Sequence, residues 1–187
     1  MDKFFGNLHL VLAVGLLAAI ALIFGVHHEL VTVNYVFRWL HVFFGITWIG
    51  LLYYFNFVQI PTMPQVPAEL KPGVSKYIAP KALFFFRWGA AFTVLTGLIV
   101  AHLTGYLVEA LTLQPDYLLI GIGMWLALIM AFNVWFLIWP AQKKALGLVE
   151  ADADTKAKAA RTAMIFSRTN TLLSIPMLYA MTNANLG

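Results

Sequence analysis

The chain has 187 residues, of which 61% are hydrophobic and only 11% are charged, and its mean hydropathy is +0.82. This composition lies well outside the range of soluble domains and predicts an integral protein of the lipid bilayer. The chain contains no cysteine. This excludes disulfides, iron–sulfur clusters, thiolate nucleophiles and c-type haem attachment, so any redox centre must depend on histidine. The formal charge of +4 lies in loops beside apolar runs, where it sets membrane orientation, and no nucleic-acid partner is predicted.

Five apolar runs follow one another along the chain, and each is close to the roughly 20 residues that a helix needs to cross about 30 Å of hydrocarbon. They do not alternate apolar and polar residues as the strands of a membrane β-barrel do. The sequence therefore predicts an all-α integral membrane protein that forms a single membrane domain over residues 1–187. The five transmembrane helices are predicted at about residues 8–26, 35–59, 82–104, 117–139 and 164–182.

The first run has a charged start and an apolar core, as a signal peptide does. It is long, however, and ends without a small-residue cleavage site, so we expect a retained membrane anchor. His9 near its start has no evident partner in the sequence and is interpreted as structural. The following loop contains His27, His28 and Glu29. We interpret this cluster as a solvated loop, because three adjacent residues converge poorly on one ion, with a copper or zinc site as the alternative.

Lysine and arginine are concentrated in two loops, 60–81 and 140–163, whereas 105–116 and the tail after Thr182 contain neither. Under the positive-inside rule the two basic loops are cytoplasmic. The N-terminus is then cytoplasmic and the C-terminus lies on the outer side of the membrane. Loop 60–81 contains five prolines and is predicted to be irregular. Loop 140–163 is rich in helix formers and is predicted to be a helical extension of the last span.

A weak internal repeat relates spans two and three to spans four and five. A shift of 77 places Trp48, Leu51, Phe55 and Asn56 on Trp125, Leu128, Phe132 and Asn133, and a shift of 81 places Phe85 and Arg87 on Phe166 and Arg168. The repeat predicts a four-helix bundle with 2+2 pseudo-symmetry about an axis along the membrane normal. The N-terminal helix is predicted to pack outside this bundle.

Two histidines in the apolar spans suggest a cofactor. His41 lies about two turns into span two and His102 lies near the outer end of antiparallel span three, so the two reach similar depth. Two such imidazoles can hold a b-type haem from both sides. Arg38 shares a helix face with His41 and is placed to meet a haem propionate. The alternative is that both histidines pack between helices and bond to a backbone carbonyl.

Further residues are assigned to the same or a neighbouring site. Gly45 would make room for a flat macrocycle, and Trp48 lies in the same segment, so both are assigned to the haem site. Arg87 and Arg168 lie one turn inside the cytoplasmic ends of their spans. They either snorkel to the headgroups or face inward as an anion site, with the intramembrane Asn56 and Asn133 as possible partners. Those asparagines could equally bridge helices.

Four long segments resemble the membrane domain of the bacterial cytochrome c-linked urate oxidases, also called membrane urate hydroxylases. These segments are RWLHVFFGITWIGLLYYFNFVQIP at 38–61, PKALFFFRWGAAFTVLTGL at 80–98, GIGMWLALIMAFNVWFLIWPAQKK at 121–144 and SRTNTLLSIPMLYAM at 167–181. The resemblance implies a redox role with electrons leaving on the outer face. Full-length members carry a C-terminal cytochrome c with a Cys-x-x-Cys-His motif, and this chain, which has no cysteine, resembles a short stand-alone form.

Together these features predict a membrane-bound b-type haem protein that exchanges electrons with a periplasmic cytochrome or a quinone. One alternative is a urate hydroxylase module that works with a separate cytochrome c. Another is a non-catalytic accessory subunit of a larger membrane complex, or a homo-oligomer, because the chain is small and its apolar spans carry many aromatic residues.

Overall fold

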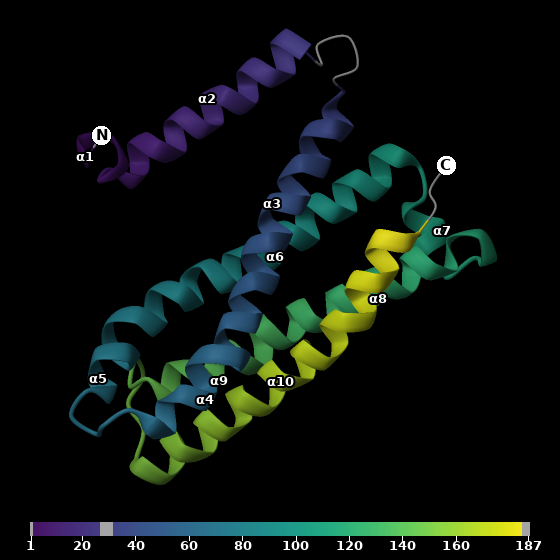
Figure 1. Ribbon diagram of the computed structural model, residues 1–187. Helices are drawn as coiled ribbons and strands as arrows, with labels where there is room; N and C mark the ends of the chain where they lie inside the picture. Colours follow the sequence, from purple (N-terminus) through teal and green to yellow (C-terminus); the bar gives the residue numbers. More distant parts are fainter. Residues whose placement is uncertain (1, 27–31, 185–187) are drawn as a thin grey trace. The chain divides into compact units, whose positions relative to one another are not determined.

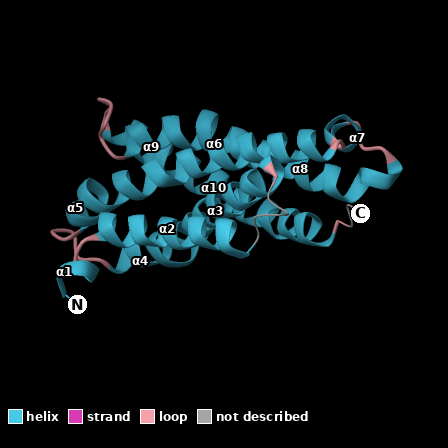
Figure 2. Ribbon diagram, turned by 90° about the horizontal axis from the view of Figure 1, so that it is seen from above, coloured by secondary structure: helices cyan, strands magenta, loops and turns pink. Residues whose placement is uncertain are grey.

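The computed structural model describes residues 2–26 and 32–184, and in these residues the chain is helical with no strand (Figures 1 and 2). This confirms the predicted all-α class for the described part of the chain. The five long helices are α2 (Leu8–Val26), α3 (Val33–Tyr53), α6 (Ala79–Thr104), α8 (Leu118–Phe132) and α10 (Ala153–Asn183). The short α-helices are α1 (Asp2–Phe5), α4 (Ile60–Thr62), α5 (Lys71–Gly73), α7 (Leu107–Leu111) and α9 (Trp139–Ala145).

The chain divides into two compact units, Met1–Val36 and Phe37–Gly187. The first contains α2, which has no buried residue. Packing of this helix against the bundle stays a prediction. The second contains the other long helices, and in it α8 and α10 lie side by side (Figure 1). The cluster His27, His28 and Glu29 lies outside the described residues.

Four helical segments in the described part are long and apolar enough to cross a membrane. They are Leu8–Val26, Val33–Gln65, Lys71–Thr104 and Pro115–Ala145. Helix α10, with 31 residues, is also long enough, but it is less apolar than these four. Its buried face carries Ser167, Asn170 and Ser174, which face other helices. Polar groups turned inward lower the hydropathy of a helix without meeting lipid, so a fifth span at α10 stays a prediction.

The prediction of an irregular loop over residues 60–81 was wrong for most of its length. Only residues 66–70 lie outside helical segments, and a 3₁₀ turn covers Met63–Gln65. Pro72 lies in the first turn of the segment that begins at Lys71, where a missing N–H is harmless because the first turn has no partner for it. Pro61, Pro64 and Pro80 lie within the continuous helical segments Val33–Gln65 and Lys71–Thr104. Loop 140–163 is helical except at residues 146–152, where Gly147 has a φ of +72°.

Three stretches are π-helical, and each ends two residues before a proline. They are η1 (Tyr54–Gln59), η3 (Val74–Ile78) and η5 (Asn133–Ile138), which precede Pro61, Pro80 and Pro140. A proline ring clashes with the carbonyl four residues earlier, and widening the preceding turn relieves that clash. Two of the widened turns end the two helices that the repeat relates, α3 and α8. The pseudo-two-fold symmetry itself stays a prediction.

Helices α3, α6, α8 and α10 share one apolar core, which includes Trp48, Leu52, Phe86, Met130 and Val134. Two asparagines cross this core by hydrogen bonds, as the helix-bridging interpretation predicted. Asn133 Nδ2 donates to Asn170 Oδ1 at 2.8 Å, and Asn56 Nδ2 donates to Ser167 Oγ at 2.8 Å. These bonds fix α10 against both halves of the bundle.

The Asn133–Asn170 pair predicts a non-additive stability effect. Asn170 is fully buried and also donates to the carbonyl of Met130 at 2.9 Å. Asn170→Leu should therefore destabilise the protein by about 1–3 kcal/mol, because the Asn133 amide is left buried without its partner. The double variant Asn133→Leu/Asn170→Leu should recover part of that loss, since neither amide remains. Unfolding in mixed micelles measures both, and strictly additive losses would show that the pair is not coupled.

Candidate functional site

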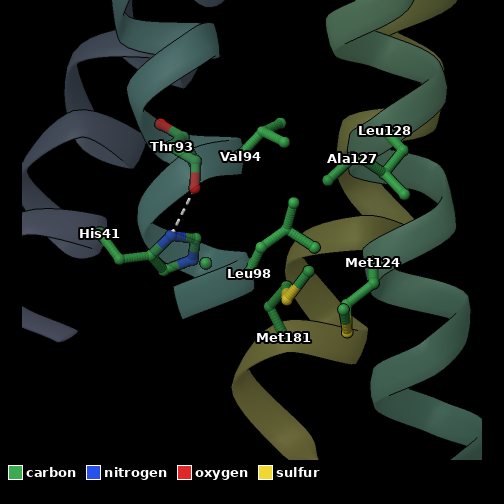
Figure 3. A pocket seen from close by; sticks show the side chains of 9 residues that line it. His41, Thr93, Val94, Leu98, Met124, Ala127, Leu128 and Met181 are labelled. Atoms are coloured by element: carbon green, nitrogen blue, oxygen red, sulfur yellow. Dashed lines mark hydrogen bonds between the residues drawn. The ribbon is translucent and has the colours of Figure 1, made fainter. Parts of the chain in front are cut away.

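His41 in α3 packs against one face of α6 and is held there by a defined hydrogen bond. Its Nδ1 lies 2.9 Å from the carbonyl oxygen of Thr93 (Figure 3). A carbonyl can only accept, so Nδ1 carries the proton and donates. In the neutral imidazole the remaining lone pair is then on Nε2. The ring lies against Gly97, where an added Cβ would be 2.8 Å from His41 Cε1. Thr93 and Gly97, one turn apart on α6, thus form the seat of the imidazole.

The imidazole lines a cavity of about 40 Å³ between α3, α6, α8 and α10 (Figure 3). The other lining residues are Thr93, Val94, Gly97, Leu98, Met124, Ala127, Leu128 and Met181. None of them is charged, and the side-chain groups able to bind a ligand are the imidazole, the two thioethers and the Thr93 hydroxyl, which already donates to the Gly89 carbonyl at 2.7 Å. Sequence reasoning singled out His41 but not the two methionines, whose approach from α8 and α10 depends on the tertiary fold.

His102 does not line this cavity. It is exposed on α6, nine residues after Thr93. Nine residues of α-helix make two and a half turns, so His102 lies on the face of α6 opposite the one that seats His41. The structure therefore places the two histidines on different sides of one helix.

Arg38, Gly45 and Trp48 also lie outside the cavity lining. Burial raises the pKa of the Tyr106 hydroxyl, and the positive charge of Arg38 partly offsets that rise, which locates Arg38 near the turn after α6. A Cβ on Gly45 would meet only Thr93 Cγ2, at an ordinary 3.9 Å. Trp48 is fully buried in the helix core, with its backbone against Gly89.

The geometry around His41 does not accommodate a haem. The His41 imidazole is suited to be one axial ligand of a haem iron through Nε2. Its other nitrogen, Nδ1, donates to a backbone carbonyl, as in many metal-ligating histidines. The cavity does not suit the macrocycle: pockets for organic ligands of this size measure roughly 300–1,000 Å³, against about 40 Å³ here. With His102 on the far face of α6, the predicted His41–His102 haem does not fit this arrangement.

The two arginines predicted as a possible anion site occupy different surroundings. The guanidinium carbon of Arg87 lies 3.4 Å from the ring centroid of Trp139, a close cation–π contact. Its Nε and Nη1 are buried without a hydrogen-bond partner. Arg168 is exposed on α10, and His9 is exposed on α2. A shared anion site of Arg87 and Arg168 stays a prediction.

A second cavity, of about 150 Å³, lies between η1, the start of α6, α9 and α10. Its polar lining residues are Gln59, Gln142 and Ser167. The side-chain oxygens of Gln59 and Gln142 are buried without a hydrogen-bond partner. Buried acceptors in proteins almost always accept a hydrogen bond, so we expect water or a ligand to donate to these two oxygens. Sequence reasoning missed this cavity; the available signal was a glutamine within two residues of a proline at the end of two apolar runs.

The fold and the His41 cavity define a helical protein with membrane-length apolar segments and a single-imidazole site in its interior. Residues 108–186, which include α8, α9, α10 and all of α7 but its first residue, match the family model described as urate oxidase N-terminal. The C-terminal part of the chain is thus similar to urate oxidase-like proteins, while His41 lies outside the matched residues. No curated protein and no solved structure matches the chain.

Proposed function

We propose that this chain is a membrane-embedded redox protein whose centre forms at His41. The observation that carries the proposal is the 2.9 Å bond from His41 Nδ1 to the Thr93 carbonyl. It leaves the Nε2 lone pair on a ring that lines an uncharged cavity, which is how proteins orient metal-ligating histidines. Similarity of residues 108–186 to urate oxidases supports an oxidoreductase role.

The proposal places the protein in a bacterial inner membrane with a cytoplasmic N-terminus. The four long apolar segments and the lysine-rich loops support this placement. With α10 as a fifth span, the His41 end of the bundle lies toward the periplasm. The partner is then a periplasmic c-type cytochrome or a quinone, which exchanges electrons at that face.

The test is to compare the redox centre of the wild type with those of two histidine variants. Potentiometric titration of the detergent-purified protein, with metal analysis and a pyridine haemochrome assay, counts the electrons and identifies the centre. His41→Ala should abolish the centre, and His102→Ala should retain it. If His41→Ala keeps the centre, or if folded wild type has none, His41 is only a helix-packing residue. Loss of a b-type haem in both variants would instead support the predicted His41–His102 haem.

The second cavity favours one further candidate, a urate hydroxylase module that works with a separate cytochrome c. The unpaired oxygens of Gln59 and Gln142 are suited to accept from ring N–H groups of a purine. Membranes containing the protein should then consume urate when a c-type cytochrome is added, and Gln142→Leu should slow that turnover. If no urate is consumed with any of several electron acceptors, the remaining candidate is an accessory subunit or a homo-oligomer. The size of the particle in mild detergent then shows whether the chain is associated with a partner or with itself.

A further inference from the structure

We propose that the His41 cavity binds a single Cu(I) ion, through Nε2 of His41 and the thioether sulfurs of Met124 and Met181. This inference rests on the proposed redox function and names the centre that carries it. The three donors come from three different helices, α3, α8 and α10, and line one cavity (Figure 3). A site assembled in this way forms only when the bundle is folded.

One glycine makes room for one of the donors. An added Cβ at Gly97 would lie 2.8 Å from His41 Cε1, whereas one at Gly123 would crowd Ala180 Cβ at 3.1 Å and make only an ordinary 3.4 Å contact with Met181 Cε. Gly97 therefore lets the imidazole lie directly on α6. Branched residues fill the remaining wall, including Val94, Leu98 and Leu128. Apart from His41 and Thr93, the methionines are thus the polarisable groups in a hydrocarbon lining.

Size and charge restrict the occupant. A space of about 40 Å³ holds an ion or a water molecule but no organic cofactor. No acidic residue lines the cavity, so nothing there would neutralise a divalent cation, and burying uncompensated charge is expensive. A monovalent ion carries the smallest such penalty.

Ligand softness then selects the metal. Thioether sulfur favours Cu(I), and imidazole also binds copper, whereas magnesium and calcium need oxygen ligands that this lining does not offer. Structural zinc sites are built from thiolates, imidazoles and carboxylates. One imidazole and two thioethers therefore point to Cu(I). The uncharged lining favours Cu(I) over Cu(II), so the couple would have a high reduction potential. One electron would pass from Cu(I) to one ferric haem of an external c-type cytochrome, and one electron from a membrane quinol would reduce the Cu(II) to Cu(I) again.

The test is an anaerobic Cu(I) titration of the full chain in detergent, against a chromogenic Cu(I) chelator. A His27→Ala/His28→Ala background removes an adventitious histidine pair. Wild type should bind one Cu(I) per chain. Met124→Leu and Met181→Leu should each weaken binding by more than the roughly 10–100-fold that loss of an outer partner costs. Met177→Leu is the matched control, because Met177 lies one turn before Met181, is buried as Met124 is, and does not line the cavity.

X-ray absorption of the copper-loaded protein provides a second readout, since sulfur scattering should fall in both methionine variants and persist in Met177→Leu. Absence of Cu(I) binding to folded wild type, or unchanged affinity in both variants, would overturn the inference. If the copper is absent but titration still finds another redox centre that His41→Ala abolishes, only the copper inference fails. If no centre of any kind is found, the proposed function fails with it.

Discussion

Replacing Gly121 by valine should cause the largest loss of stability of any single substitution considered. Gly121 is buried in α8, and a Cβ added there would overlap the backbone carbonyl oxygen of Ala110 in α7. Backbone cannot swing aside as a side chain can, so α7 or α8 must shift. Overpacking of this kind typically costs about 1–3 kcal/mol, occasionally more. We expect the loss of unfolding free energy in Gly121→Val to lie at or above the upper end of that range, and the loss in Gly121→Ala to lie within it.

The measurement is the thermal unfolding midpoint of the detergent-purified protein, together with the yield of monodisperse material. Gly50→Ala is the matched control, because Gly50 is an exposed residue of α3 and an added Cβ there meets nothing within 4 Å. Alanine should stabilise that helix slightly, by up to about 1 kcal/mol. Equal midpoints for Gly121→Ala and Gly50→Ala would show that the α7–α8 contact is not constrained.

The apolar runs predicted the long helices well, because hydropathy and length are local properties of the sequence. The proline-rich loop was predicted poorly for the opposite reason. Whether a proline breaks a helix depends on whether the preceding turn can widen, and Pro61 and Pro80 each follow a π-helical turn inside a continuous helical segment. The same prolines set the π-helical turns that precede them. The π-helical turn before Pro61 places Phe55 and Gln59 in the lining of the second cavity, which a pattern of 3.6 residues per turn does not reveal.

The candidate site was predicted in part. His41 was found because an imidazole in an apolar span is costly unless it has a partner, and the structure supplies one in the Thr93 carbonyl. The pairing with His102 came from depth alone. Depth does not fix the direction in which a side chain leaves its helix. His102 lies on the face of α6 opposite the one that contacts His41. The sequence did not single out Met124 and Met181 as site residues, because methionine commonly fills gaps in the packing of apolar helices.

Substitution at Gly97 should remove the proposed redox centre while leaving the fold in place. In Gly97→Ala the new Cβ would lie 2.8 Å from Cε1 of His41 and 3.1 Å from Nδ1. The far end of a side chain can yield, so the imidazole moves and the helices do not. That movement breaks the 2.9 Å bond to the Thr93 carbonyl and turns Nε2 away from the cavity. Loss of such an orienting partner costs roughly 10–100-fold in metal affinity, and the bulkier Gly97→Val should abolish binding.

Gly45→Ala is the control for this series, since its Cβ would make only an ordinary contact with the same α6 face. Redox titration and metal content should fall in the order wild type and Gly45→Ala, then Gly97→Ala, then Gly97→Val, while helical content and elution volume stay constant. A Gly97→Val protein that keeps a full redox centre would mean that the electrons reside elsewhere than at His41. If the Gly97→Ala protein unfolds, the seat of the imidazole is rigid. The His41→Ala/Gly97→Ala double variant should then regain stability, because the added methyl group enters the space that the ring has left.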